Sequence, residues 1–468
     1  MGRRRASVLA AGLTMVGALY CLGCVAEAGS SKTRLVTREE EIAEVRPGVV
    51  VPSIVVSPDS RHIAWVAARD GGKCVLLDGV EGKAYDGVDT IVFSPDGARV
   101  GYLAWRGGKG VAVVDGVEAE HERVGKECLV FSPDSRRVAY LAGSSEKMSV
   151  VVDGVAGQEY DGILHGSGPT FSPDSQHLAY VGKREGKWRL VLDGSETECE
   201  EVAVDTLAFS PDGKRVAYVV GGSGKRFAMV IDGVRSNEYD QIEKGGLAFS
   251  PDSQRTACVA SRDGKWFPVV DGVEVHDFDD VGPFAPAFSP DSKRVAYMAK
   301  RGEKWSLVVD GAEVQREDNV GPFPPVFSTE GKMAYIVTTK GGSAMVLDGN
   351  KGRTYDGIGV PGYGFSPDGQ RFMYVAQRGK ESIVVVDEVE GKAYDVVAAP
   401  IFSFDSKHFA YLAVRGEKWV PVVDGMEGKE YDGPWPGAKL VSVNPSVFRI
   451  LVRNKLRVVR VELEVVQE

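Results

Sequence analysis

A segment of 37 to 40 residues recurs from near the N-terminus of this chain to its C-terminus. Most copies open with an aromatic residue followed by Ser-Pro-Asp and continue with an apolar run resembling Val-Ala-Tyr. A repeat of this period indicates one small structural unit stacked many times, so it determines the architecture before any single residue is considered. The residues that head the copies are Val56, Phe93, Phe131, Phe171, Phe209, Phe249, Phe288, Phe327, Phe365 and Phe402, with a worn copy at Val441.

Each copy predicts four short strands joined by tight turns. A first strand such as 247–249 ends at a Pro-Asp-Ser turn (251–253), in which Pro fixes its own φ and Asp can bond the backbone ahead. A second strand such as 295–299 and a third such as 305–309 are separated by a loop rich in Gly and charged residues. Asp310-Gly311 then forms a hairpin to a short fourth strand, with Gly supplying the positive φ that such a turn needs.

The second and third strands are apolar on both faces, as in Val384-Val385-Val386, so both faces of each sheet should be covered. Four-stranded sheets packed face to face and repeated radially make a β-propeller. The sequence therefore predicts an all-β propeller of about eleven four-stranded modules of 37–40 residues. The last copy, 441–462, ends after its third strand, and we expect the N-terminal strand at 42–45 to complete it.

The number of rings is open on sequence grounds. Single propellers typically have four to eight blades, which slightly favours two rings over one large ring. Every connection between third and fourth strands has the same short Asp turn, which favours one.

The repeat as written at 209–218, Phe-Ser-Pro-Asp-Gly-Lys-Arg-Val-Ala-Tyr, resembles the TolB-type propeller repeat of bacterial exported proteins and lipoproteins, related to the WD repeat. The resemblance covers nearly everything after residue 40 and implies a propeller fold. TolB proper carries a separate N-terminal domain for which we see no space here, so a TolB-like role with Pal or colicins is not implied.

The N-terminus has the pattern of an export signal: Arg3 to Arg5 precede an apolar run at 6–22. We expect residues 1–28 to be a signal peptide or lipoprotein leader, 29–40 a linker and 41–468 the propeller repeats. Leu22-Gly23-Cys24 resembles the end of a lipobox and predicts lipidation of Cys24, whereas Ala26-Glu27-Ala28 fits ordinary cleavage. An uncleaved anchor is the third alternative. Each predicts an exported protein of the periplasm or cell envelope.

Charge and motif content narrow the functional classes. The chain has 56 Lys and Arg against 66 Asp and Glu, which argues against nucleic acid as a partner. The Asp of each hairpin is better explained by turn formation than by calcium, since close runs of oxygen ligands are lacking. The histidines show no metal or catalytic spacing. Beyond the leader, Cys74, Cys128, Cys199 and Cys258 lack the spacing of a disulfide framework, so we expect unpaired thiols. We therefore expect no cofactor, no metal and no catalytic residues.

The features that do not recur lie in connections from a fourth strand to the next first strand. They should share one face of the propeller with the loops between second and third strands, which are repeatedly basic. This face is our candidate binding site, with an aromatic and basic surface suited to anionic or amphipathic partners. Its residues are His165, Arg262, Phe284, Arg301, Phe323, Tyr363 and Trp435.

The functional hypothesis is an envelope-associated, non-catalytic binding platform for protein partners or envelope polymers, anionic ones included. Membrane association would come only through a lipid anchor or the leader. One alternative is a propeller lyase or hydrolase acting on an acidic glycan, and another is a structural propeller without a specific ligand. A propeller is a scaffold on which many activities occur, so the fold does not choose among them.

Overall fold

The computed structural model of the chain describes residues 33–45, 53–69, 71–164, 168–204, 206–221, 226–243, 247–276, 278–282, 284–314, 319–321 and 323–467. The leader with Cys24 and the loop residue His165 lie outside these described residues. Within them, no helix is long and apolar enough to cross a membrane.

The described residues form eleven antiparallel sheets, here called blades 1 to 11 in chain order. Blades 1 to 4 comprise β2 (Val55–Val56), β3 (Ile63–Arg69), β4 (Gly72–Leu77) and β5 (Val80–Tyr85); β6 (Gly87–Phe93), β7 (Val100–Arg106), β8 (Lys109–Val114) and β9 (Val117–His121); β10 (Arg123–Val124), β11 (Val130–Phe131), β12 (Val138–Gly143), β13 (Met148–Val152) and β14 (Val155–Tyr160); and β15 (Gly162–Ile163), β16 (Thr170–Phe171), β17 (Leu178–Arg184), β18 (Lys187–Leu192) and β19 (Ser195–Cys199).

Blades 5 to 8 comprise β20 (Ala208–Phe209), β21 (Val216–Val220), β22 (Ala228–Ile231) and β23 (Val234–Arg235); β24 (Gln241–Ile242), β25 (Ala248–Phe249), β26 (Thr256–Arg262), β27 (Lys265–Val270) and β28 (Val273–Glu274); β29 (Asp280–Val281), β30 (Ala287–Phe288), β31 (Val295–Arg301), β32 (Lys304–Val309) and β33 (Ala312–Glu313); and β34 (Asn319–Val320), β35 (Val326–Phe327), β36 (Met333–Thr339), β37 (Gly342–Leu347) and β38 (Asn350–Tyr355).

Blades 9 to 11 comprise β39 (Gly357–Phe365), β40 (Phe372–Arg378), β41 (Glu381–Val386) and β42 (Val389–Tyr394); β43 (Val396–Phe402), β44 (Phe409–Arg415), β45 (Lys418–Val423) and β46 (Met426–Glu427); and β47 (Gly433–Pro434), β48 (Val441–Asn444), β49 (Val447–Asn454), β50 (Arg457–Gln467) and β1 (Thr33–Glu44). The four-strand module that the repeat predicts is confirmed.

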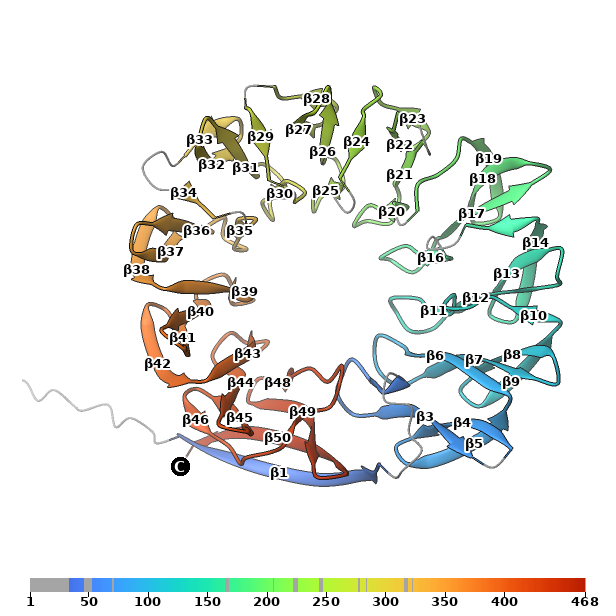
Figure 1. The fold of residues 1–468 in the computed structure, drawn as a ribbon, viewed down its shortest axis with the longest axis horizontal. Coiled ribbons are helices and arrows are strands. Elements are labelled where there is room, and N and C mark those ends of the chain that lie inside the picture. The colour runs from blue at the N-terminus through green and yellow to red at the C-terminus, as the bar shows by residue number, and fades with distance from the viewer. Residues whose placement is uncertain are drawn as a thin grey trace, which may run out of the picture.

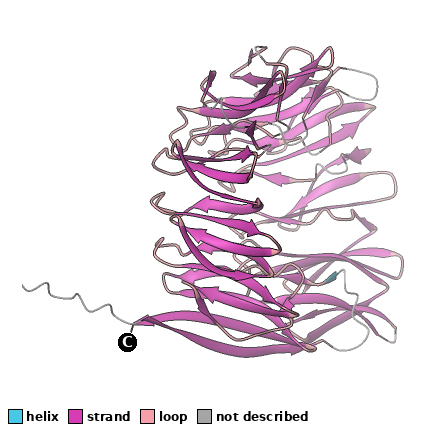
Figure 2. Ribbon diagram, turned by 60° about the vertical axis from the view of Figure 1, so that its left-hand side comes forward, coloured by secondary structure: helices cyan, strands magenta, loops and turns pink. Residues whose placement is uncertain are grey.

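The blades are arranged in one ring around an open centre (Figure 1). Figure 2 shows the same ring from another angle, with strands making up most of each blade. Eleven buried apolar clusters join neighbouring blades, one at each successive interface. One of them packs Leu451 and Val458 of blade 11 against Ile63 and Trp65 of blade 1, which completes the circle. The described residues therefore place all eleven blades in one ring, whereas the sequence slightly favoured two rings.

The N-terminal strand closes the ring. β1 pairs with β50 in antiparallel register from Thr33 opposite Gln467 to Glu44 opposite Arg457. This confirms the predicted closure, but the strand begins at Thr33, whereas the sequence analysis assigned residues 29–40 to a linker. In the structure, residues 33–44 form the outermost strand of blade 11.

Candidate functional site

The loop arginines that were expected to form a basic face are engaged within their own blades. In seven blades the Arg at the end of the second strand forms an ion pair, at 2.6 to 3.3 Å, with a Glu twelve residues later on the fourth strand. These pairs are Arg69–Glu81, Arg106–Glu118, Arg184–Glu196, Arg262–Glu274, Arg301–Glu313, Arg378–Glu390 and Arg415–Glu427.

Four of these glutamates also receive a hydrogen bond from a Tyr of the preceding blade. The Tyr85 hydroxyl donates to Glu118 Oε1 at 2.6 Å, and the Arg106 guanidinium lies over the Tyr85 ring, 5.7 Å from its centre. We call this arrangement the Tyr–Glu–Arg contact. Arg106 and Tyr85, in that order, lower the pKa of Glu118 from 4.5 to about 2. Equivalent hydrogen bonds are Tyr160–Glu196, Tyr355–Glu390 and Tyr394–Glu427.

Two candidate residues belong to this arrangement. Arg262 donates to both Glu274 carboxylate oxygens, at 2.8 and 2.9 Å, and lies over the ring of Tyr239. Arg301 pairs with Glu313 at 3.3 Å and lies over Phe278, but its side chain is 60% exposed. The guanidinium charges are thus largely matched by carboxylates of their own blades, and the face is less basic than the sequence indicated.

The aromatic candidates occupy different environments. Phe284 is 44% exposed, whereas Trp435 is 6% exposed and packs in the cluster between blades 11 and 1. Phe323 and Tyr363 are brought together at the interface of blades 8 and 9, where the Tyr363 hydroxyl donates to the Pro324 carbonyl at 2.9 Å. Trp435 is therefore a core residue, because apolar side chains of two blades enclose it.

Tyr363 also lines a groove between β39 of blade 9 and β43 of blade 10, which we call the blade 9–10 groove. Two adjoining hollows of about 430 and 470 Å³ compose it and share Gly362, Ala399 and Pro400. Its lining residues are Gly359, Gly362, Tyr363, Gly364, Phe365, Pro367, Met373, Val375, Gln377, Gly379, Lys380, Ser382, Asp395, Val396, Val397, Ala398, Ala399, Pro400, Ile401 and Phe402.

The strands that wall this groove break their register beside it. The ladder between β39 and β40 is interrupted between Ile358 and Tyr363, and that between β43 and β44 between Ala398 and Ile401. Ala399 has φ +51°, a left-handed conformation that costs a residue with a Cβ about 1 to 2 kcal/mol. The ladder of blade 2 has the same break, between Val88 and Ile91, and breaks of this kind end the pairing of backbone groups locally.

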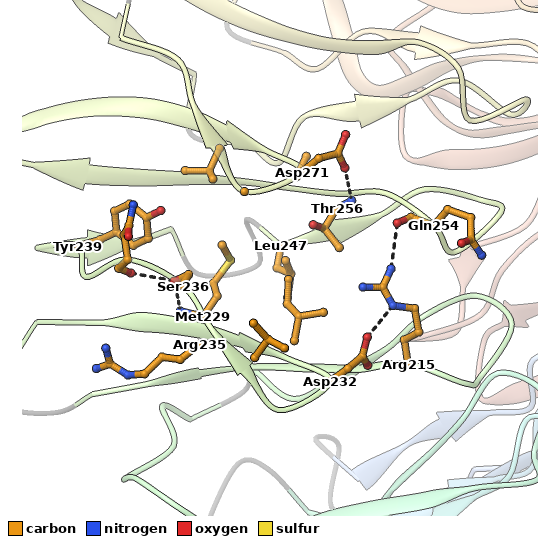
Figure 3. A pocket seen from close by; sticks show the side chains of 16 residues that line it. Arg215, Met229, Asp232, Arg235, Ser236, Tyr239, Leu247, Gln254, Thr256 and Asp271 are labelled. Atoms are coloured by element: carbon orange, nitrogen blue, oxygen red, sulfur yellow. Dashed lines mark hydrogen bonds and ion pairs between the residues drawn. The ribbon is translucent and has the colours of Figure 1, made fainter.

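On the opposite edge of the blades, the hairpin Asp residues hold the turn between first and second strands. Asp232 Oδ1 accepts the Val216 N–H at 3.0 Å and Oδ2 accepts Arg215 Nε at 2.8 Å, while Arg215 Nη1 donates to the Gln254 carbonyl of the next blade (Figure 3). These groups border a pocket of about 530 Å³ between blades 5 and 6. Every hairpin Asp has φ near +50°, as turn formation predicts.

Three histidines that seemed scattered in the sequence occupy the Arg215 position of their blades. His62, His177 and His408 place Nδ1 at 2.6, 2.6 and 2.5 Å from Asp78, Asp193 and Asp424, respectively. Counting five residues from the Ser of each Ser-Pro-Asp would have found this shared position. Their role is to anchor the turn, as Arg does in other blades.

The remaining candidate chemistry is sparse in the described part of the chain. Cys74, Cys128, Cys199 and Cys258 are free thiols, and all but Cys199 are buried. Burial raises the pKa of Cys128 to about 11 and that of Cys258 to about 12. Among the described residues no group of three or more His, Cys, Asp and Glu side chains could hold a metal ion.

No family model matches the chain, and no curated protein matches it. Similar solved structures include a eukaryotic initiation factor (11% identity, TM-score 0.41, covering 80% of this chain and 96% of that one). They also include a putative TolB from Agrobacterium tumefaciens (16%, 0.25, 44% and 83%) and the β-propeller domain of the Trilobed protease from Pyrococcus furiosus (12%, 0.27, 57% and 97%).

The chain is a β-propeller, because its eleven antiparallel sheets stand around one circle.

Proposed function

We propose that this propeller is a non-catalytic binding platform and that the blade 9–10 groove receives an extended segment of a partner protein. The observation that carries the proposal is the groove itself, an open hollow between two blades walled by Gly, Pro and aromatic residues. Peptide-binding sites of this kind combine side-chain pockets with exposed backbone.

The groove offers both elements. Tyr363, Phe365, Ile401 and Phe402 supply apolar area for the side chains of a bound segment. The register breaks in β39 and β43 leave backbone groups beside the hollow outside the ladder, where they could bond to an extended chain. A Gly-rich wall supports the same binding mode, because a backbone can approach it closely.

The proposed setting is the periplasm or cell envelope. It is supported by the N-terminal sequence, with its Arg residues, apolar run and Cys24. Envelope polymers, including anionic ones, are the alternative occupants of the groove.

A site-specific photocrosslinking experiment tests the proposal. Val396 lines the groove and is 48% exposed; Val314, equally exposed on blade 7, provides a matched control position. A crosslinking amino acid at 396 should capture a defined protein in intact cells, and the same group at 314 should not. In a pull-down, the Val396→Glu variant should recover about tenfold less of that protein than the wild type does, since the bound segment would bury an unpaired carboxylate, which is strongly unfavourable. Equal capture from both positions, or capture from neither, would refute the proposal.

A further inference from the structure

Among the described residues, the hairpin Asp of blade 8 pairs with no cation, unlike every other hairpin Asp. In blades 1 to 7, 9 and 10 this Asp forms an ion pair with an Arg or His side chain and accepts a hydrogen bond from the N–H of the first residue of the second strand. In blade 8, Asp348 has neither partner among the described residues, and it is exposed.

The sequence of blade 8 explains why Asp348 has no Arg or His partner among the described residues. Its first turn is one residue shorter: the Ser328 N–H bonds the Lys332 carbonyl, whereas the Ser366 N–H of blade 9 bonds the Arg371 carbonyl. Lys332 stands where other blades carry Arg or His, and its ammonium pairs with Glu330 at 3.5 Å instead of Asp348.

A second carboxylate departs from the repeat at the neighbouring hairpin. Glu388 replaces the Gly that follows Asp in the other hairpins and has φ +65°, a conformation unfavourable for a residue with a Cβ. Its side chain reaches across to blade 8, since a Cβ on Gly352 would lie 2.9 Å from Glu388 Oε2.

These groups border one pocket of about 600 Å³ between blades 8 and 9, at the place where blades 5 and 6 form the pocket of Figure 3. Phe365, Phe372 and Leu347 contribute apolar surface. Of the cations lining it, Arg371 pairs with Asp387, Lys332 with Glu330, and Lys351 also has an interaction of its own. Asp348 and Glu388 are therefore the two pocket carboxylates that neither Arg371 nor Lys332 pairs with.

We propose that the pocket between blades 8 and 9 binds the side chain of an arginine supplied by a partner protein. Its guanidinium would occupy the position that Arg215 holds against Asp232 in Figure 3, with Glu388 as a second carboxylate. The aliphatic part of the side chain would lie against Phe365 and Phe372. Arg fits better than Lys because its planar fork can pair with carboxylates at two positions. The site is separate from the blade 9–10 groove and does not depend on it.

The test uses the tripeptide acetyl-Gly-Arg-Gly-amide in a ligand-observed NMR titration, with the neutral citrulline analogue as control. We expect a Kd of about 1 mM for the Arg peptide and no binding of the citrulline peptide. Asp348→Asn should weaken binding about tenfold or more, because it removes a charge-assisted hydrogen bond. Glu303→Gln, which removes an exposed carboxylate from a loop of blade 7, should leave it unchanged.

Two further variants separate binding from folding. Lys332→Arg should restore the internal pair with Asp348, raise the melting temperature and abolish peptide binding. Glu388→Gly should relieve the left-handed conformation and weaken binding several-fold without loss of stability. Equal binding by wild type, Asp348→Asn and Lys332→Arg would overturn the proposal, as would absence of binding at about 20 mM peptide. Binding of agmatine without binding of the tripeptide would overturn the assignment to a protein side chain.

Discussion

The Tyr431 hydroxyl donates a hydrogen bond to Glu39 Oε1 at 2.5 Å, although 392 residues separate the two in sequence. Glu39 lies on β1 and holds the position that Glu118, Glu196, Glu390 and Glu427 hold on the fourth strands of other blades. Lys429 adds an ion pair at 2.9 Å, and Tyr431 and Lys429 lower the pKa of Glu39. The N-terminal strand therefore supplies blade 11 with the Tyr–Glu contact that other blades build from local sequence.

Replacing Glu39 with Ala should loosen the closure of the ring. The change leaves the largely buried Tyr431 hydroxyl without its acceptor, so we expect a loss of about 1 to 2 kcal/mol in the free energy of unfolding. Urea denaturation measures the loss, and hydrogen exchange should show faster opening of the amides of β1 and β50. Glu41→Ala is the matched control, because Glu41 pairs with Arg457 in an exposed bridge and should cost less than about 0.5 kcal/mol. Equal effects of the two changes would contradict the assigned role of Glu39.

Acid should destabilise the propeller through its Tyr–Glu–Arg contacts. Glu118 and Glu274 have pKa values lowered from 4.5 to about 2, each chiefly by its Arg partner. A carboxyl group whose pKa is lower when folded contributes stability above about pH 4.5, and this contribution disappears as the pH falls towards 2. The melting temperature of the wild type should therefore fall as the pH is lowered from 6 to 2. The Glu118→Gln variant should have a lower melting temperature than the wild type at pH 6, but its melting temperature should fall less steeply with pH. A variant with the same slope as wild type would rule out Glu118 as a contributor.

Charge reversal at Arg262 should lower stability. Arg262→Glu places two carboxylates together and removes a cation from the Tyr239 ring, which should cost about 2 kcal/mol or more. Thermal melting checks this. Arg136→Glu is the control, because the Arg136 side chain is 86% exposed and its ion pair with Asp134 is long, at 4.0 Å. This change should alter the free energy of unfolding by less than about 0.5 kcal/mol. An unchanged melting temperature for Arg262→Glu would return this residue to the candidate binding face.

Lipidation of Cys24 is tested by fractionation. If the leader is processed as a lipoprotein, Cys24→Ala should move the protein from the membrane pellet to the soluble fraction, because the acyl chains supply the anchor. Cys21→Ala provides the control within the same apolar run. Membrane association that persists in Cys24→Ala would exclude the lipid anchor, and release of a protein beginning at Gly29 would support cleavage after Ala28.

The repeat was sufficient to predict the strands, the turns and the closure of the ring, because each depends on local sequence that recurs in every copy. Pro-Asp-Ser and Asp-Gly specify their turns wherever they occur, and Val-Val-Asp identifies the end of a third strand. The number of blades in one ring depends instead on the angle between neighbouring sheets, which follows from side-chain packing across every interface. A general expectation about propeller size was therefore a poor guide here.

The candidate site was harder to predict for the same physical reason. Arg262 looked like a free cation because its partner Glu274 is twelve residues away on another strand, and Trp435 looked exposed because its loop is rich in Pro and Gly. The departures from the repeat were visible in the sequence: Glu388 in place of Gly, and the shortened turn before Lys332. Their significance became clear only from the structure, in which the hairpin Asp of nine other blades pairs with an Arg or His.

The pairing of β1 with β50 has a consequence for how the molecule is made. The strand β1 that completes blade 11 precedes the other strands of the ring in the chain, and its partner β50 follows them. During synthesis the growing chain therefore carries an unpaired strand edge until β50 has been made, and a premature stop before Arg457 would leave the circle open. Closure of the ring thus depends on synthesis of every blade.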